Sequence, residues 1–322
     1  MKRILCIVLS LVVLFSFAAC GKSKEKETSG LPNNGDIVDI KTVDVINSAF
    51  SATEKALESV TSLGFKSEVK LTVTAEGQTV VSTGGTEFRF IKGDVLKVFN
   101  KTVLKNDLMN SELYMFTDGV STYGATAGAT YLITSGTDTT KYFADLLKAA
   151  EICNTADITP VNVKIVNASG GGYGFVAIYP VDNLPDSLKT LISEQLSKLG
   201  NVKGKNLKVS GMINADGRLE AQTVTYDFTY EYEALANDVD PDNLDSNVPT
   251  TVKKTAEGSL SVSVEIDYDV TEVTQGSHIV LPTAEQEPLK EMSLADFQIL
   301  ATLSGAVDDD STESGESDVT KQ

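Results

Sequence analysis

The chain of 322 residues has no tryptophan and a single histidine, His278. A multi-histidine metal site is therefore excluded, and a histidine-containing triad would have to use His278. We interpret His278 as a surface or strand-end residue. Neither a G-x-S-x-G nucleophile elbow nor a phosphate-binding loop occurs in the sequence. These absences favour a protein that is not an enzyme and has no cofactor, with an envelope hydrolase built on paired carboxylates as the remaining catalytic alternative.

Basic residues are scarce: 27 lysines and arginines stand against 45 aspartates and glutamates, for a formal net charge of −18. A surface this acidic repels phosphate backbones and anionic lipid headgroups. The balance argues against nucleic acid as a partner and against membrane docking through a basic patch. It favours solubility.

The amino-terminus has the layout of a secretory signal. Lys2 and Arg3 precede an apolar run over 4–17, which is shorter than the roughly 20 residues that cross a bilayer core. The run ends in "FAAC", which resembles a bacterial lipobox with Phe in the place of the usual Leu. The resemblance implies cleavage after Ala19 and lipidation of Cys20. A plain secreted protein with an incidental cysteine is the alternative.

Acyl chains such as palmitate on Cys20 would give a long-lived membrane anchor, because each buried methylene contributes about 0.8 kcal/mol. The polar residues that follow predict a flexible linker with a mean reach of roughly 25 Å. Cys6 leaves with the signal and the Cys20 thiol is lipidated, so Cys153 has no cysteine to pair with and an intramolecular disulfide is excluded. We expect Cys153 to be a small buried hydrophobe.

Apolar spacing predicts three main helices and many strands. The helices are expected over 43–63, 141–152 and 185–199, with a short fourth one after Ser293, which stands at capping-box spacing from Asp296. The expected strands are 65–73, 79–83, 86–92, 95–104, 130–133, 161–167, 173–180, the segment "NLKVSGMI", the long segment after Gly217, and 260–270.

Turn residues punctuate these strands. Glu76-Gly77, the pair Gly84-Gly85 and Asn214–Gly217 predict turns, and Asp118-Gly119 predicts a two-residue primed hairpin turn. A polar loop is expected over about 234–258. One-sided alternation indicates antiparallel strands with one wet face. The fold class is therefore α+β: a strongly curved antiparallel sheet, an incomplete β-barrel, covered by a few helices.

This order of elements resembles the LolA-like superfamily, which includes the LppX and LprG lipoproteins. The likeness covers about residues 43–283. It is carried by the opening helix, by "LYMFTDGVSTYGATAGATYLI", by "GMINADGRLEAQTVTYDF" and by a segment ending in "HIVLP". The resemblance implies an incomplete barrel around helices, with an apolar cavity for acyl chains.

An aromatic stripe in the long strand is the main candidate site. We expect it to line the cavity, with two phenylalanines and the 260–270 segment opposite it. The candidate lining residues are Phe88, Phe90, Val224, Tyr226, Phe228, Tyr230, Tyr232, Val262, Val264 and Ile266. The same pattern also fits a filled core in an anchored structural or protein-interaction module without a ligand.

A weaker candidate is the segment "NDVDPDNLDSN", where four carboxylates could surround a calcium ion: Asp238, Asp240, Asp242 and Asp245. The segment lacks the glycine and the final glutamate of an EF-hand loop. A solvated acidic loop is the favoured interpretation.

The sequence thus predicts four parts. They are a lipoprotein signal peptide over 1–19, the lipidated cysteine and linker over 20–41, a LolA-like domain over 42–304, and an acidic disordered tail over 305–322. The expected location is extracytoplasmic, with the protein tethered to the cell membrane of a Gram-positive bacterium. The expected partners are the membrane, a lipid-like ligand and an envelope protein.

Overall fold

The structure is a computed structural model. It describes residues 40–106, 109–126, 128–134, 152–168, 170–182, 201–235, 251–283 and 287–304, together with residues 184, 189, 192, 196 and 199.

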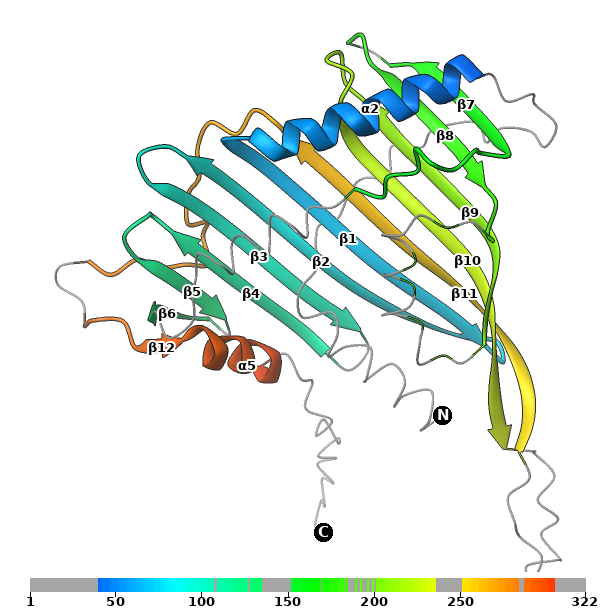
Figure 1. Ribbon diagram of the computed structural model, residues 1–322. Coiled ribbons are helices and arrows are strands. Elements are labelled where there is room, and N and C mark those ends of the chain that lie inside the picture. Colours follow the sequence, from blue (N-terminus) through cyan, green and yellow to red (C-terminus); the bar gives the residue numbers. More distant parts are fainter. Residues whose placement is uncertain are drawn as a thin grey trace, which may run out of the picture.

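Two antiparallel meanders and one short edge strand make up the sheet (Figure 1). The first follows helix α2 (Ile40–Ser59) and comprises β1 (Ser62–Ala75), β2 (Gln78–Lys92), β3 (Leu96–Asn106), β4 (Met109–Thr117), β5 (Thr122–Thr126) and β6 (Ala129–Thr134). The second comprises β7 (Asn162–Asn167), β8 (Tyr173–Tyr179), β9 (Val202–Ile213), β10 (Leu219–Leu235) and β11 (Thr251–Asp267). The last described elements are β12 (Glu291–Ser293) and α5 (Leu294–Ser304).

The meanders join where β1 pairs with β11, which gives the order β12-β6-β5-β4-β3-β2-β1-β11-β10-β9-β8-β7. All of these pairings are antiparallel except β12 on β6. The sheet is curved and unclosed, with β12 and β7 at its two edges (Figure 1). This confirms the predicted fold class of a curved, incomplete antiparallel barrel with helices.

Alternation along the strands produces one continuous apolar face, which we call the inner face. Phe65 on β1 stands between Phe88 on β2 and Ile266 on β11, and all three side chains are buried. Because side chains alternate along each strand, this register places every second residue of the neighbouring strands on the same face.

Helices α2 and α5 pack on the inner face at separate places. Ile46, Ala49, Phe50 and Thr53 of α2 are fully buried and recur at helical spacing. Figure 1 shows α2 lying across one end of the strands. Helix α5 packs through Leu294, Phe297 and Ala301 near β4 and β5. Its predicted cap is confirmed, because Ser293 Oγ accepts the Asp296 N–H at 3.1 Å and donates to the Asp296 carboxylate at 2.6 Å.

The opposite, outer face is not uniformly wet. Residues 268–281 cross it, and Val270, Val273 and Ile279 cover Tyr114 and Phe116, which are buried. His278 stacks on Tyr114 with ring centroids 4.1 Å apart. The expectation of one fully wet face was therefore wrong over β4 and β5. This outer segment buries apolar groups there.

Three local predictions were also wrong. Strand β2 runs straight through Gly84-Gly85, because Gly84 is paired on both sides, with Val69 and Leu104. The hairpin between β4 and β5 has a four-residue loop over 118–121, in which the Asp118 carboxylate accepts N–H groups at 2.8 Å from Val120 and Ser121. The polar loop predicted over 234–258 is shorter, since β11 already begins at Thr251.

Two predicted helices fall wholly or mostly outside the described residues. The segment 141–152 is described only at its last position. Within 185–199, Lys189, Ile192 and Leu196 are helical.

Candidate functional site

The inner face brings together all ten candidate lining residues. Phe88 and Phe90 lie on β2, the five from Val224 to Tyr232 on β10, and Val262, Val264 and Ile266 on β11. Strands β10 and β11 are direct neighbours, with Val224 beside Val262, so the 260–270 segment does not stand opposite the stripe as expected. Phe88 and Phe90 lie on the same sheet, beyond β1.

Four aromatic rings form a row along β10, which we call the aromatic track: Tyr226, Phe228, Tyr230 and Tyr232. Successive ring centroids are 6.0, 6.4 and 5.9 Å apart, within the usual range for aromatic contacts. Phe228 is 0% exposed and Tyr230 is 3% exposed, whereas Tyr232 is half-buried. The track therefore leads from the interior of the domain toward solvent.

Glycines on the neighbouring strands leave room for these rings. A Cβ on Gly258 of β11 would lie 2.3 Å from the Phe228 ring, and one on Gly204 of β9 would lie 2.7 Å from the Tyr226 hydroxyl. Real Cβ contacts are not this short, so a larger residue would displace a ring. The two glycines let the rings spread over the adjacent strands.

Burial favours the neutral form of two hydroxyls of the track, those of Tyr226 and Tyr230. Loss of solvation raises the pKa of Tyr226, with a smaller contribution from the charge of Asp182. It also raises the pKa of Tyr230, with a contribution from Tyr232. A neutral, apolar face of this kind can hold hydrocarbon by burial.

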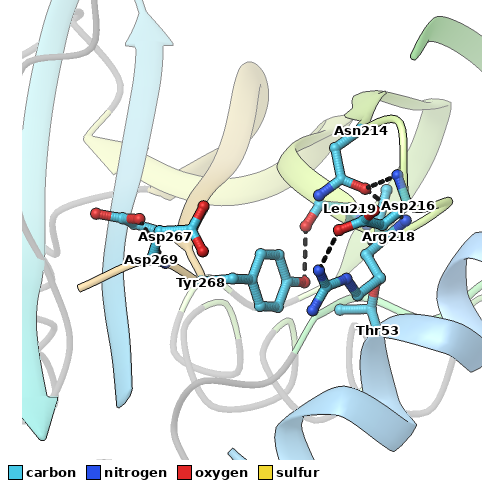
Figure 2. Close-up of polar contacts among 8 residues, drawn as sticks. All are labelled: Thr53, Asn214, Asp216, Arg218, Leu219, Asp267, Tyr268 and Asp269. Carbon is cyan, nitrogen blue, oxygen red and sulfur yellow. Dashed lines mark hydrogen bonds and ion pairs between the residues drawn. The ribbon is translucent and has the colours of Figure 1, made fainter. Parts of the chain in front are cut away.

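The end of the inner face under α2 is closed by polar contacts around the β9–β10 turn (Figure 2). Thr53 Oγ1 accepts the Leu219 N–H at 2.8 Å, and the Tyr268 hydroxyl donates to the Leu219 carbonyl oxygen at 2.8 Å. Arg218 stacks 4.4 Å above the Tyr268 ring. Burial raises the pKa of Tyr268, and Thr53 and Arg218 partly offset this shift.

The turn itself was predicted from "NADG". Asn214 Oδ1 accepts the N–H groups of Asp216 and Arg218 at 3.1 and 2.9 Å, and Gly217 has a positive φ of 77°. The contacts that fix α2 to this turn were not predicted. The one sequence feature that could have indicated these contacts is that Thr53 is a polar residue on the apolar face of the predicted helix.

Cys153 is half-buried, not fully buried as expected, and it contacts the apolar core. Its backbone N–H and carbonyl oxygen both bond to the Gln222 side chain at 2.8 Å. Gln222 is a polar residue on the inner face of β10, and these two bonds satisfy its amide. The pair fastens the segment that begins at Ile152 to the sheet.

The opposite end of the inner face extends beyond the sheet. Strand β9 pairs with β10 only up to Tyr230, and β1 pairs with β11 only from Glu257 onward. Residues 231–235 and 251–256 therefore form a two-stranded ribbon that we call the arm, which projects past the other strands in Figure 1. Tyr232 and Val252 continue the apolar inner side onto the arm.

The remaining candidates fall outside the described residues: Cys20 and the acidic residues Asp238, Asp240, Asp242 and Asp245. Among the described residues, no three histidine, cysteine, aspartate or glutamate side chains are grouped to hold a metal ion. No helix in that part of the chain combines the length and apolar character that a membrane crossing requires.

No family model matches the chain, and no curated protein matches it. Solved structures match the chain only at low similarity, and three of them are described here. LprF from Mycobacterium bovis is 10% identical, with a TM-score of 0.33 over 78% of this chain and 100% of that one. A DUF1329 family protein from Desulfovibrio piger is 10% identical, with a TM-score of 0.21 over 72% of this chain and 95% of that one.

A beta-barrel-like DUF1849 protein from Brucella abortus is 13% identical, with a TM-score of 0.17 over 65% of this chain and 100% of that one. At these TM-scores the likenesses carry no functional argument. The fold rests on the strand pairing described above.

Proposed function

We propose that this protein is a membrane-anchored lipoprotein of the bacterial cell envelope that binds a lipid-like ligand on the inner face, without catalysis. The observation that carries the proposal is the aromatic track, a row of rings on a continuous apolar face that runs from the interior of the domain to its surface. Affinity would come from burial of apolar area, about 25 cal/mol per Å² before ordering costs.

The anchoring part of the proposal rests on the sequence. The signal peptide would occupy 1–19, Cys20 would carry the acyl chains, and residues up to 41 would hold the domain of 42–304 off an extracytoplasmic membrane surface. The tail over 305–322 would stay acidic and solvated.

Native mass spectrometry tests the ligand. The chain from residue 20 onward, with Cys20→Ser to prevent acylation, is purified without detergent. An added mass that organic extraction removes is the expected result. A ligand-free mass, together with no uptake of a fluorescent fatty acid, would overturn the proposal.

One observation favours the alternative of an interaction module with a filled core. Phe228, Tyr226 and Tyr230 are buried by other parts of the chain, as they would be in a core without space for a ligand. The same mass measurement separates the two functions.

A further inference from the structure

The end of the aromatic track carries a positive charge that comes from the inward-facing side of β11. Every second residue of β10 and β11 faces inward, from Gln222 to Ala234 and from Val252 to Ile266. Within these two described series, Lys254 is the one charged residue. It pairs directly with Tyr232 in the strand register, so the ammonium group lies where the row of rings ends.

A carboxylate already occupies this position. Glu76 forms an ion pair and hydrogen bond with Lys254, and the two side chains are 54% and 34% exposed. Glu76 lies in the β1–β2 turn with a positive φ of 54°, a backbone region that favours glycine and asparagine. An exposed ion pair contributes only about 0 to 1 kcal/mol, so another anion can displace Glu76.

At the opposite end of the track, buried rings of α2 and β8 pack against each other. There Phe50 of α2 packs edge-on against Phe175 at 6.5 Å, and both rings are at most 1% exposed. Thr53 and Tyr268 bind the two backbone groups of Leu219. An elongated ligand therefore has its buried end near α2 and its exposed end at the arm.

We propose that the ligand is an amphiphile with an anionic head, bound with its head at Lys254 and its hydrocarbon chain along the aromatic track toward α2. This inference rests on the proposed function and specifies the chemistry and direction of the ligand. A carboxylate or a phosphate head would satisfy Lys254, replacing the Glu76 carboxylate as its partner.

Calorimetric titration of the Cys20→Ser chain with hexadecanoate, hexadecyl phosphate and uncharged hexadecanol tests the charge. Lys254→Met should weaken binding of the anionic ligands about fivefold and leave hexadecanol unchanged. Glu76→Gln should strengthen binding of the two anionic ligands, because it removes the carboxylate that pairs with Lys254. Lys253→Met is the matched control, since Lys253 is on the opposite side of the arm beside Glu233 and should have no effect.

A second measurement tests direction, using the absence of natural tryptophan. Tyr232→Trp places one indole at the half-exposed end of the track. Hexadecanoate brominated beside its carboxylate should quench this fluorescence more strongly than octadecanoate brominated at carbons 11 and 12. In the calorimetric titration, the tighter binding of hexadecanoate or of hexadecyl phosphate identifies the preferred head as carboxylate or phosphate.

The outcomes separate the two proposals. The head position is wrong if a ligand binds but Lys254→Met and Lys253→Met change its affinity equally. It is also wrong if the two brominated fatty acids quench in the reverse order. Either result would leave the proposed function standing. If none of the three ligands binds to the Cys20→Ser chain, both the head position and the proposed function are overturned.

Discussion

The two ends of the inner face differ in how they are held. At one end α2 closes the sheet with fully buried rings and satisfied backbone groups around Thr53 and Leu219. At the other end two strands leave the sheet as the arm, and an isolated two-stranded ribbon contributes little stability by itself. The α2 end therefore stabilises the domain, whereas the arm end contributes little to stability and is the end that we propose contacts the ligand's head.

The largest expected effect is a difference in stability between truncating Phe50 at the α2 end and truncating Tyr232 at the arm end. Phe50→Ala should lower the free energy of unfolding by about 3 to 5 kcal/mol, because it leaves a cavity under α2. Tyr232→Ala should cost less than about 1 kcal/mol, since the ring is half-exposed. Urea unfolding followed by circular dichroism measures both, and equal losses would remove the distinction between the ends.

The next largest loss of stability is expected when a larger residue is placed against the middle of the aromatic track. Gly258→Ala puts a methyl group against the Phe228 ring and should cost about 2 kcal/mol of stability. Gly93→Ala is the control, because a Cβ there meets nothing within 4 Å. Similar unfolding midpoints for the two variants would show that the Phe228 ring has room to move.

A smaller effect is expected from the polar closure under α2. Thr53→Val keeps the shape but leaves the buried Leu219 N–H without its acceptor, at a cost of about 1 to 2 kcal/mol. Ser48→Ala, at an exposed position of the same helix, should change little. If amide exchange at Leu219 does not accelerate in Thr53→Val, the hydroxyl is not what secures this end.

The smallest expected effect is on pH dependence. Burial raises the pKa of Tyr226 and Tyr230 above the ordinary value of 10.0, so the folded state retains these protons longer than the unfolded state does. Their contribution to stability is complete below pH 10 and is lost as the pH rises through the folded pKa values. Urea midpoints at pH 8 and pH 11 should differ less in a Tyr226→Phe, Tyr230→Phe double variant than in the parent. An unchanged difference would contradict this assignment.

Much of the site followed from alternation alone. The spacing of Val224, Phe228 and Val262 predicted which residues share a face, and the register confirms that they do. Alternation is local, however, and it does not say which strands are neighbours. The pairing of β1 with β11, which joins the two meanders, was therefore not visible in the sequence.

The arm was missed for a related reason. Residues 251–257 are mostly polar, so the segment looked like part of a loop, and only its pairing with the end of β10 makes it a strand. The signal that could have identified Lys254 was the alternation itself: counted back in twos from Leu260, it places Lys254 in the inward-facing series.

The most direct test of the account is to map where a hydrocarbon chain binds. The Cys20→Ser chain is irradiated with a fatty acid that carries a photoreactive diazirine in mid-chain, and the modified peptides are sequenced by mass spectrometry. Adducts are expected on the inner-face residues of β10 and β11 around Phe228 and Val262, and excess hexadecanoate should suppress them. Adducts confined to the outer face, or none that hexadecanoate suppresses, would contradict it.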